Sequence, residues 1–106
     1  PGIDINAPIG TPVLASENGI VTKISNSKDR NGYGIYILLK HSNGYETFYA
    51  HLNRALVIEN EVIKRGQVIG EVGNTGMTVG PHVHFEIRKD GTAVDPAQFV
   101  LPLEMK

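Results

Sequence analysis

The chain has 106 residues, with 10 Lys or Arg against 11 Asp or Glu and a formal net charge of -1. This length predicts one domain, residues 1–106, and the absence of cysteine excludes disulfides, thiolate metal sites and thiol catalysis. Balanced charge without a basic cluster argues against a nucleic-acid partner. No apolar run approaches the roughly 20 residues of a membrane-spanning helix, so we expect no transmembrane segment in this chain.

The composition favours strands over helices. Ile contributes 11 residues and Val 10, whereas Leu contributes 7 and Ala 6. Twelve Gly and six Pro interrupt the chain at short intervals, and no window of about 11 residues keeps an apolar stripe at helical spacing. The sequence therefore predicts an all-β fold.

An acidic residue, Asp4, lies near the start of the chain between Ile3 and Ile5. If this segment is extended, the carboxylate points away from the face that the two isoleucines bury. Taken alone, an aspartate near a glycine is more often a turn residue than a metal ligand. Asp4 is thus a candidate that needs partners elsewhere in the chain.

Residues 35–52 predict a β-hairpin. Asn43-Gly44 is the dipeptide that a two-residue type I′ turn prefers, because both central residues need a positive φ. A tight turn at this point would pair Leu39 with Phe48 on the core face, and Tyr36 with His51 on the other.

Two histidines lie in this hairpin, with different expected roles. The predicted register presents His51 on the polar face, away from the core, where it could also be only an aromatic neighbour of Tyr36. It places His41 on the core face opposite Glu46. We expect His41 to make a structural hydrogen bond at the end of the hairpin, outside any site.

A second strand is predicted over residues 82–87, preceded by a loop over residues 73–81 that contains three glycines. Val83, Phe85 and Ile87 alternate with His82, His84 and Glu86, so the two sets face opposite sides.

The spacing of His82 and His84 permits a metal site. Two residues along a strand cover about 6.6 Å, and both imidazoles project to the same side. A catalytic zinc takes imidazole nitrogen and carboxylate oxygen from three protein ligands and keeps one position open. Half-exposed histidines with no metal are the commoner reading, so spacing alone supports a metal site and no more.

Eight motifs together resemble one known family, the lysostaphin-like or LytM-type zinc metalloendopeptidases, and the match covers about the whole chain in order and spacing. The most specific is Gly80-Pro-His-Val-His-Phe-Glu86, supported by Gly73-x-Thr-Gly76 and Tyr49-Ala-His51-Leu52. The others are Gly-Ile-Asp-Ile near the start, Gly10-Thr-Pro-Val13, Gly19-Ile-Val, Gly32-Tyr-Gly34 and Gly66-Gln-Val-Ile-Gly70. The resemblance implies a mostly antiparallel β-sheet groove and, as substrate, the cross-linking peptides of bacterial peptidoglycan.

The resemblance also implies residue roles. Asp4 and His84 correspond to metal ligands for one zinc ion. His51 and His82 correspond to the two catalytic histidines that flank the water activated by the metal, one taking a proton and one stabilising the oxyanion.

The chain departs from the family pattern in two places. The family's first zinc ligand is a histidine four residues before the aspartate, and that position precedes Pro1, so we expect a chain truncated just before it. Asn60-Glu61 replaces the usual Gly-Asp, and asparagine tolerates the positive φ of such a turn.

Three hypotheses follow from the sequence. The first is a zinc endopeptidase acting on peptidoglycan in the bacterial envelope, outside the cytoplasm. The second is a degenerate LytM-type domain that binds or regulates other envelope proteins. Both non-ligand histidines favour the enzyme, whereas the missing first ligand favours the module. A lipoyl-like carrier hairpin, suggested by residues 62–70, lacks a lysine at the Asn43-Gly44 tip and is the weakest of the three.

Overall fold

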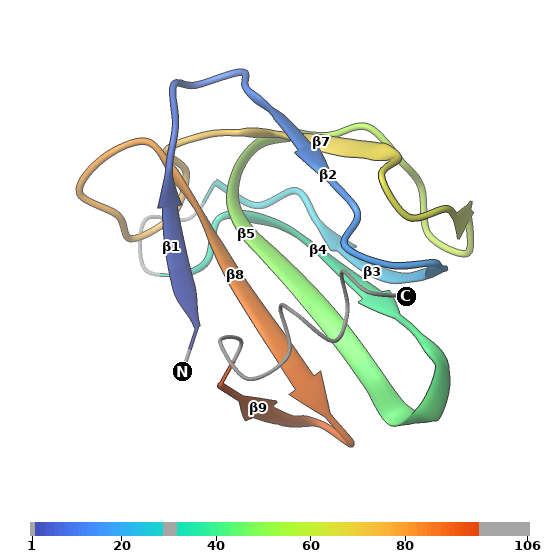
Figure 1. The fold of residues 1–106 in the computed structure, drawn as a ribbon. Helices are drawn as coiled ribbons and strands as arrows, with labels where there is room; N and C mark the ends of the chain where they lie inside the picture. The colour runs from blue at the N-terminus through green and yellow to red at the C-terminus, as the bar shows by residue number, and fades with distance from the viewer. Residues whose placement is uncertain (1, 29–31, 96–106) are drawn as a thin grey trace.

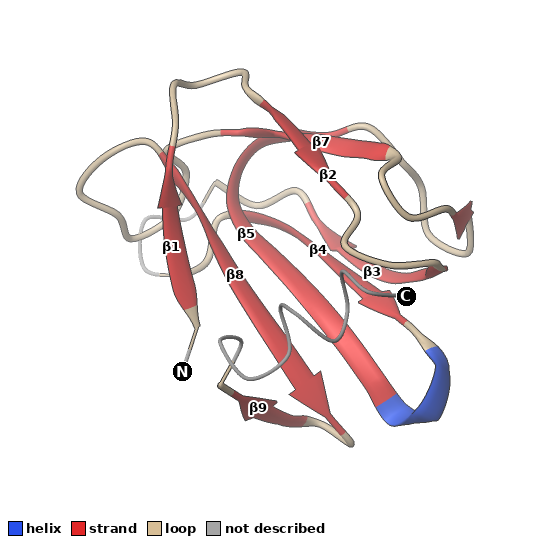
Figure 2. Cartoon of the chain, in the orientation of Figure 1, coloured by secondary structure: helices blue, strands red, loops and turns tan. Residues whose placement is uncertain are grey.

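Nine antiparallel strands form one sheet in the computed structural model, which describes residues 2–28 and 32–95 (Figure 1). The strands are β1 (Ile3–Asn6), β2 (Pro12–Leu14), β3 (Gly19–Ser25), β4 (Ile35–Lys40), β5 (Tyr45–Ala55), β6 (Val62–Ile63), β7 (Val68–Val72), β8 (His82–Lys89) and β9 (Thr92–Val94). Figure 2 shows strands and loops with one short helical turn, Ser42–Gly44. The all-β, antiparallel fold is confirmed. Within the described ranges, no helix is long and apolar enough to cross a membrane.

The order of the strands places the segment that carries Asp4 beside the segment that carries His82 and His84. The main path of the sheet runs β1-β8-β5-β4-β3-β6, while β7 pairs with both β2 and β5, and β9 pairs with β8. The long strand β5 bends, so that its first part lies between β4 and β8 and its last part lies beside β7 (Figure 1). The first strand of the chain therefore lies directly beside the His-x-His strand β8.

One face of β8 packs on the core, as the alternation predicted. Val83 is 6% exposed and Ile87 is 2% exposed, and the core continues through the fully buried Ile37, Leu39 and Leu52. We call this side of the sheet the core face. The opposite side, which carries His82, His84 and Glu86 of β8, is the histidine face.

The hairpin turn differs from the expected type I′ turn. Three residues, Ser42–Gly44, make the connection, with Asn43 and Gly44 at φ values of 61° and 78°, and the His41 N–H donates to the Tyr45 carbonyl at 2.8 Å. The extra turn residue shifts the pairing by one position.

As a result, the predicted pairing of Leu39 with Phe48 is wrong. Leu39 pairs with Thr47 and Ile37 with Tyr49, so that Thr47 and Tyr49 lie on the core face. Phe48 lies instead on the histidine face, where it is 3% exposed because aromatic and cationic neighbours cover it.

A β-bulge then returns the far end of the hairpin to the register that a two-residue turn predicts. Ile37 pairs with Tyr49 and Ile35 with Leu52, which leaves two residues of β5, Ala50 and His51, opposite Tyr36 alone. His51 takes the left-handed conformation, with φ at 62°, and its N–H donates to the Tyr33 carbonyl at 2.8 Å. Bulges of this kind turn a side chain out of the strand's regular alternation.

Asn60 adopts the positive φ expected of the residue that replaces the family's glycine, with a value of 73°.

Candidate active site

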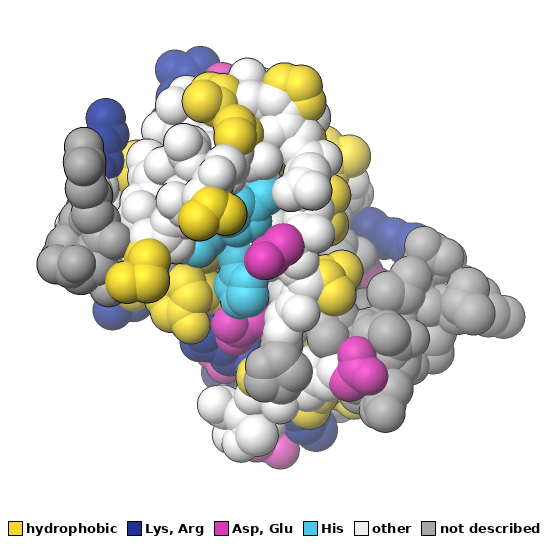
Figure 3. Space-filling view, turned by 90° about the vertical axis from the view of Figure 1, so that its left-hand side faces the viewer, with side chains coloured by type: hydrophobic (Ala, Val, Ile, Leu, Met, Phe, Trp, Pro, Cys, Tyr) yellow, Lys and Arg dark blue, Asp and Glu magenta, His cyan; other side chains and the backbone are white. Residues whose placement is uncertain are grey.

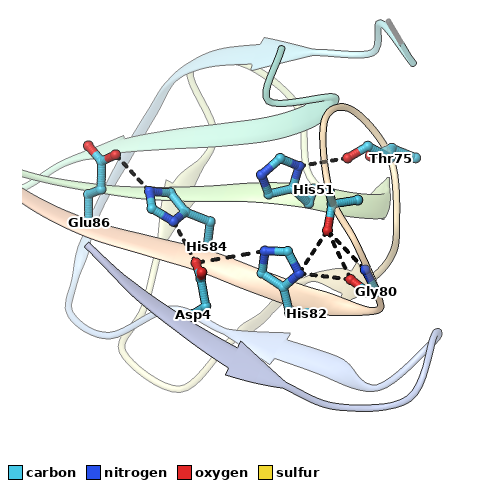
Figure 4. A network of polar contacts seen from close by, with 8 residues as sticks. Asp4, His51, Thr75, Gly80, His82, His84 and Glu86 are labelled. Carbon is cyan, nitrogen blue, oxygen red and sulfur yellow. Dashed lines mark hydrogen bonds and ion pairs between the residues drawn. The ribbon is translucent and has the colours of Figure 1, made fainter. Parts of the chain in front are cut away.

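Four side chains from three strands meet on the histidine face (Figure 4). In the β1–β8 pair, Asp4 is directly opposite His84, and its Oδ1 lies 2.7 Å from His84 Nδ1 and 3.7 Å from His82 Nε2. The imidazole of His51, from the bulge in β5, has its ring centroid 5.0 Å from that of His82. The structure thus brings together all four site residues expected from the sequence.

The cluster is accessible from outside the molecule. Figure 3 shows the histidine side chains recessed between walls of backbone and hydrophobic side chains, with a carboxylate beside them. The side chain of Asp4 is 60% exposed, whereas those of His82 and His84 are 12% and 20% exposed. A polar substrate can therefore reach the cluster from solvent.

His84 is held at both ring nitrogens. Nδ1 bonds to Asp4 Oδ1 at 2.7 Å, and Nε2 bonds to Glu86 Oε2 at 2.8 Å. The ring of Tyr33 stacks on the imidazole, with centroids 5.8 Å apart and planes 22° apart. These contacts fix both the plane of the ring and the direction of its Nδ1 atom.

His51 is held at one nitrogen only. Its Nδ1 lies 2.7 Å from the Thr75 carbonyl oxygen, which can only accept, so Nδ1 carries the proton and Nε2 holds the lone pair of the neutral ring. Burial lowers the pKa of His51, and the Thr75 carbonyl opposes this only in part. The residue is 6% exposed, so the expectation of a presented, unburied side chain is corrected: the bulge turns the imidazole under the loop. A neutral imidazole with a free Nε2 can act as a base.

His82, like His51, is held through Nδ1 by a backbone carbonyl. Its Nδ1 lies 2.8 Å from the Gly80 carbonyl and 3.0 Å from the Thr78 hydroxyl, and the same hydroxyl donates to that carbonyl at 2.9 Å. Because the carbonyl accepts only, Nδ1 carries a proton and Nε2 points toward the cluster (Figure 4).

The loop over residues 73–81 therefore orients both of these histidines, and Thr75 fixes the loop to the sheet. The Thr75 hydroxyl donates to the Leu52 carbonyl at 2.6 Å and accepts from the Ile35 N–H at 3.1 Å, next to the bulge. Gly76, at φ 79°, approaches Gly32 so closely that a Cβ would clash with the Gly32 carbonyl oxygen. A side chain at position 76 would displace the loop.

Asp4 is ionised over a wide pH range. The hydrogen bond from His84 lowers the pKa of its carboxyl, the nearby histidines add to this, and slight burial opposes it. An ionised carboxylate and imidazole nitrogens are the hard and intermediate donors that zinc accepts.

As donors, Asp4 Oδ1 and His84 Nδ1 fit two adjacent positions of a zinc site, because they lie 2.7 Å apart on neighbouring strands and are of the types that zinc accepts. Glu86 at the far nitrogen of His84 is the outer partner that a ligating histidine ordinarily has. Within residues 2–28 and 32–95, no group of three or more His, Asp or Glu side chains is arranged to hold a metal ion.

His41 lies apart from this cluster and has the structural role expected. Its ring nitrogens bond to the Asn18 carbonyl at 2.6 Å and to the Thr47 hydroxyl at 2.7 Å. The expected partner across the strands is wrong, because the three-residue turn places Glu46 opposite Lys40 instead.

Sequence reasoning did not assign roles to several residues that contact the histidines. They are Tyr33, Thr75, Thr78, Gly80 and Glu86. The alternation in β8 did place Glu86 beside His84, which was a usable signal. The contacts of Thr75, Thr78 and Gly80 with the histidines have no such signal in the sequence, because they depend on how the glycine-rich loop folds back on the sheet.

The opposite side of β1 and β8 has a different character. An apolar cavity of about 430 Å³ lies there, lined by Ile3, Ile5, Val83 and Phe85 among others. Its lining contains no histidine or carboxylate.

Comparison with known proteins agrees with this geometry. Residues 1–96 match the family described as peptidase family M23. The chain belongs to peptidase family M23. This membership implies a metal cofactor and confirms the likeness to lysostaphin-type and LytM-type peptidases.

Two curated relatives are similar to this chain in sequence. The DD-carboxypeptidase/endopeptidase Mpg of Neisseria meningitidis serogroup B is 46% identical over 101 residues, and the peptidoglycan DD-endopeptidase ShyC of Vibrio cholerae is 43% identical over 101 residues. Each alignment covers 95% of this chain and 23% of the relative. The chain thus spans about a quarter of the length of these relatives.

Two solved structures share the fold. The catalytic domain of lysostaphin from Staphylococcus simulans superposes with a TM-score of 0.84 at 33% identity, covering 94% of this chain and 77% of that one. A zinc-containing peptidase from Vibrio cholerae superposes with a TM-score of 0.82 at 37% identity, covering 89% and 28%. The groove-forming antiparallel sheet is that of the M23 peptidases.

Proposed function

We propose that this chain is the catalytic domain of a zinc-dependent peptidoglycan endopeptidase that cleaves cross-linking peptides in the bacterial envelope, outside the cytoplasm. The observation that carries the proposal is the convergence of Asp4, His51, His82 and His84 on one accessible face of the sheet. The relatives named as DD-endopeptidases support the substrate class, and the zinc-containing peptidase supports the metal.

Asp4 and His84 would hold the zinc ion, with a further ligand from the family's position four residues before Asp4, which lies outside these 106 residues. When bound, zinc would supply a Lewis acid that polarises the scissile carbonyl and eases deprotonation of water. The hydrogen bond between Asp4 and His84 holds the two donor atoms side by side.

His51 and His82 would move protons and stabilise charge. Each has Nδ1–H bound to a backbone carbonyl, which leaves Nε2 to face the substrate. One imidazole would take a proton from the attacking water, and the other, when protonated, would donate a hydrogen bond to the developing oxyanion. Burial lowers the pKa of His51, which favours the neutral ring whose Nε2 can accept a proton.

The test is digestion of purified peptidoglycan sacculi, with the released fragments identified by mass spectrometry. We expect cross-linked dimers to decrease and their monomeric products to increase, and we expect chelator or His82→Ala to stop this change. Intact dimers after digestion by a zinc-loaded protein would overturn the proposal. Sacculus binding together with stimulation of another wall hydrolase would then favour the regulatory module.

A further inference from the structure

Glu86 joins the histidine cluster to a neighbouring cation. Its Oε2 lies 2.8 Å from His84 Nε2, and its Oε1 lies 3.0 Å from Arg88 Nε. Only 9% of its side chain is exposed. A carboxylate that is removed from water needs such partners at both oxygens.

The surroundings of Glu86 leave it little freedom. The Arg88 guanidinium stacks over the ring of Phe48, with the Cζ atom 4.3 Å from the ring centroid. On the other side, Gly2 lies close to both His84 and Glu86. A Cβ at this position would lie 2.7 Å from His84 Cε1 and 2.9 Å from Glu86 Cγ. Arg88 and Gly2 together confine the carboxylate to the edge of the imidazole.

The contact with Glu86 keeps a proton on one chosen nitrogen of the imidazole. An ionised carboxylate only accepts hydrogen bonds, so Glu86 holds a proton on His84 Nε2, and Nδ1, whose N–H faces Asp4 in the metal-free chain, is the nitrogen whose proton a metal ion would replace. A metal ion requires an unprotonated ring nitrogen, and Nδ1 becomes that nitrogen when Nε2 keeps its proton.

We propose that Glu86, held by Arg88, is a positioning residue that fixes the tautomer and orientation of His84 so that Nδ1 binds a divalent metal ion together with Asp4. This inference rests on the proposed function for the identity of the metal site. A purely structural ion pair with Arg88 would need one oxygen of Glu86, whereas the second oxygen is committed to the histidine.

The experiment compares zinc affinity among matched variants by competition with a chromogenic chelator. The variants are Glu86→Ala, the near-isosteric Glu86→Gln and the control Glu71→Gln. Glu71 has the same kind of contacts, with one oxygen 3.1 Å from Arg54 Nε and the other 3.0 Å from Asn53 Nδ2, but it has no histidine partner.

We expect Glu86→Ala to bind zinc ~10–100-fold more weakly, as changes to outer partners of ligating histidines do. Glu86→Gln can still accept from Nε2–H through its amide oxygen, so it should lose less, and Glu71→Gln should match the wild-type protein. A second measurement, ¹⁵N NMR of the His84 ring in metal-free protein, should show a hydrogen-bonded Nε2–H that is lost in Glu86→Ala.

Wild-type zinc affinity and an unchanged His84 Nε2–H signal in Glu86→Ala would overturn the inference. If Glu86→Ala fails to fold, the same two measurements on Glu86→Met decide it, because methionine has a similar length and no oxygen that accepts from Nε2–H, and wild-type values for both would again overturn it. Zinc affinity that depends on Glu86 in a protein that cleaves no peptidoglycan would retain the inference and reject the proposed peptidase. If wild-type protein binds no zinc, the proposed function fails and the inference fails with it.

Discussion

Asp4 and His84 are 80 positions apart in the sequence and directly opposite each other in the β1–β8 pair, with Oδ1 and Nδ1 2.7 Å apart. Neither strand could create this contact alone, because it depends on the register between the first strand of the chain and the eighth. Neighbouring residues in the same register, Ile3 opposite Phe85 and Ile5 opposite Val83, line the apolar cavity on the other face. Correct pairing of these apolar residues therefore also aligns the two polar ones.

We expect Asp4→Ala and His84→Ala to lose zinc. Each removes a donor atom, so binding should weaken by more than the ~10–100-fold that changes to outer partners cost. Metal analysis of purified protein that includes the family's first ligand position should give about one equivalent for wild type and much less for either variant. His41→Gln is the control, because His41 bonds to Asn18 and Thr47 instead. Unchanged zinc content in His84→Ala would contradict the assignment.

Removal of metal should abolish activity and leave the fold intact. The buried cluster around Ile37, Leu39 and Leu52 lies on the core face and includes no residue of the proposed metal site. A chelator should therefore barely move the thermal transition, unlike a structural zinc domain, which unfolds when its metal is removed. Circular dichroism melts with and without chelator measure this, and loss of the cooperative transition on chelation would contradict it.

His51→Ala and His82→Ala should reduce turnover far more than zinc affinity. Loss of a positioned acid or base typically costs ~10²–10⁴-fold in rate. Both imidazoles present Nε2 to the cluster with Nδ1 already bonded to the backbone, an arrangement suited to proton transfer. Rates on a soluble cross-linked peptide, together with zinc content, separate the two effects. A variant that lost zinc as completely as Asp4→Ala would identify that histidine as a ligand.

Thr78→Val should lower kcat modestly without changing zinc affinity. The substitution keeps the shape of the side chain and removes the hydroxyl that lies 3.0 Å from His82 Nδ1. A hydrogen bond of about 0.5–1.5 kcal/mol corresponds to a rate loss of ~2–12-fold. Thr78→Ser restores the hydroxyl and should recover most of the rate. Equal losses in the valine and serine variants would point to loop packing rather than to His82.

Tyr49 should make the fold sensitive to high pH. Burial raises the pKa of its hydroxyl, although hydrogen bonds with Ser16 and Thr47 oppose this. The stabilisation is complete below the unfolded-state pKa of about 10 and is lost as pH rises above it, because the unfolded chain releases the proton first. Urea titrations between pH 8 and 11 should show a steeper loss of stability for wild type than for Tyr49→Phe. Identical pH slopes in the two proteins would contradict the prediction.

The sequence by itself determined the class of the fold and the faces of β8. Alternation has a period of two residues and is a local property, so Val83 and Ile87 could be placed in the core and His82 and His84 on the other face without knowledge of any partner strand. The motifs pointed to four residues that the structure brings together on one face, because their types and spacing are present in the chain itself.

The tertiary structure decided the register of the hairpin and the support of the site. One additional residue in the Ser42–Gly44 turn shifted the pairing, and one bulge at His51 shifted it back. Neither can be read from alternation, which assigns the residues of one strand to two faces but does not say how many residues form a turn or where a bulge interrupts the pairing. The roles of Glu86 and Thr75 also required the folded chain, because a hydrogen bond between distant segments depends on distance and direction, and sequence spacing fixes neither.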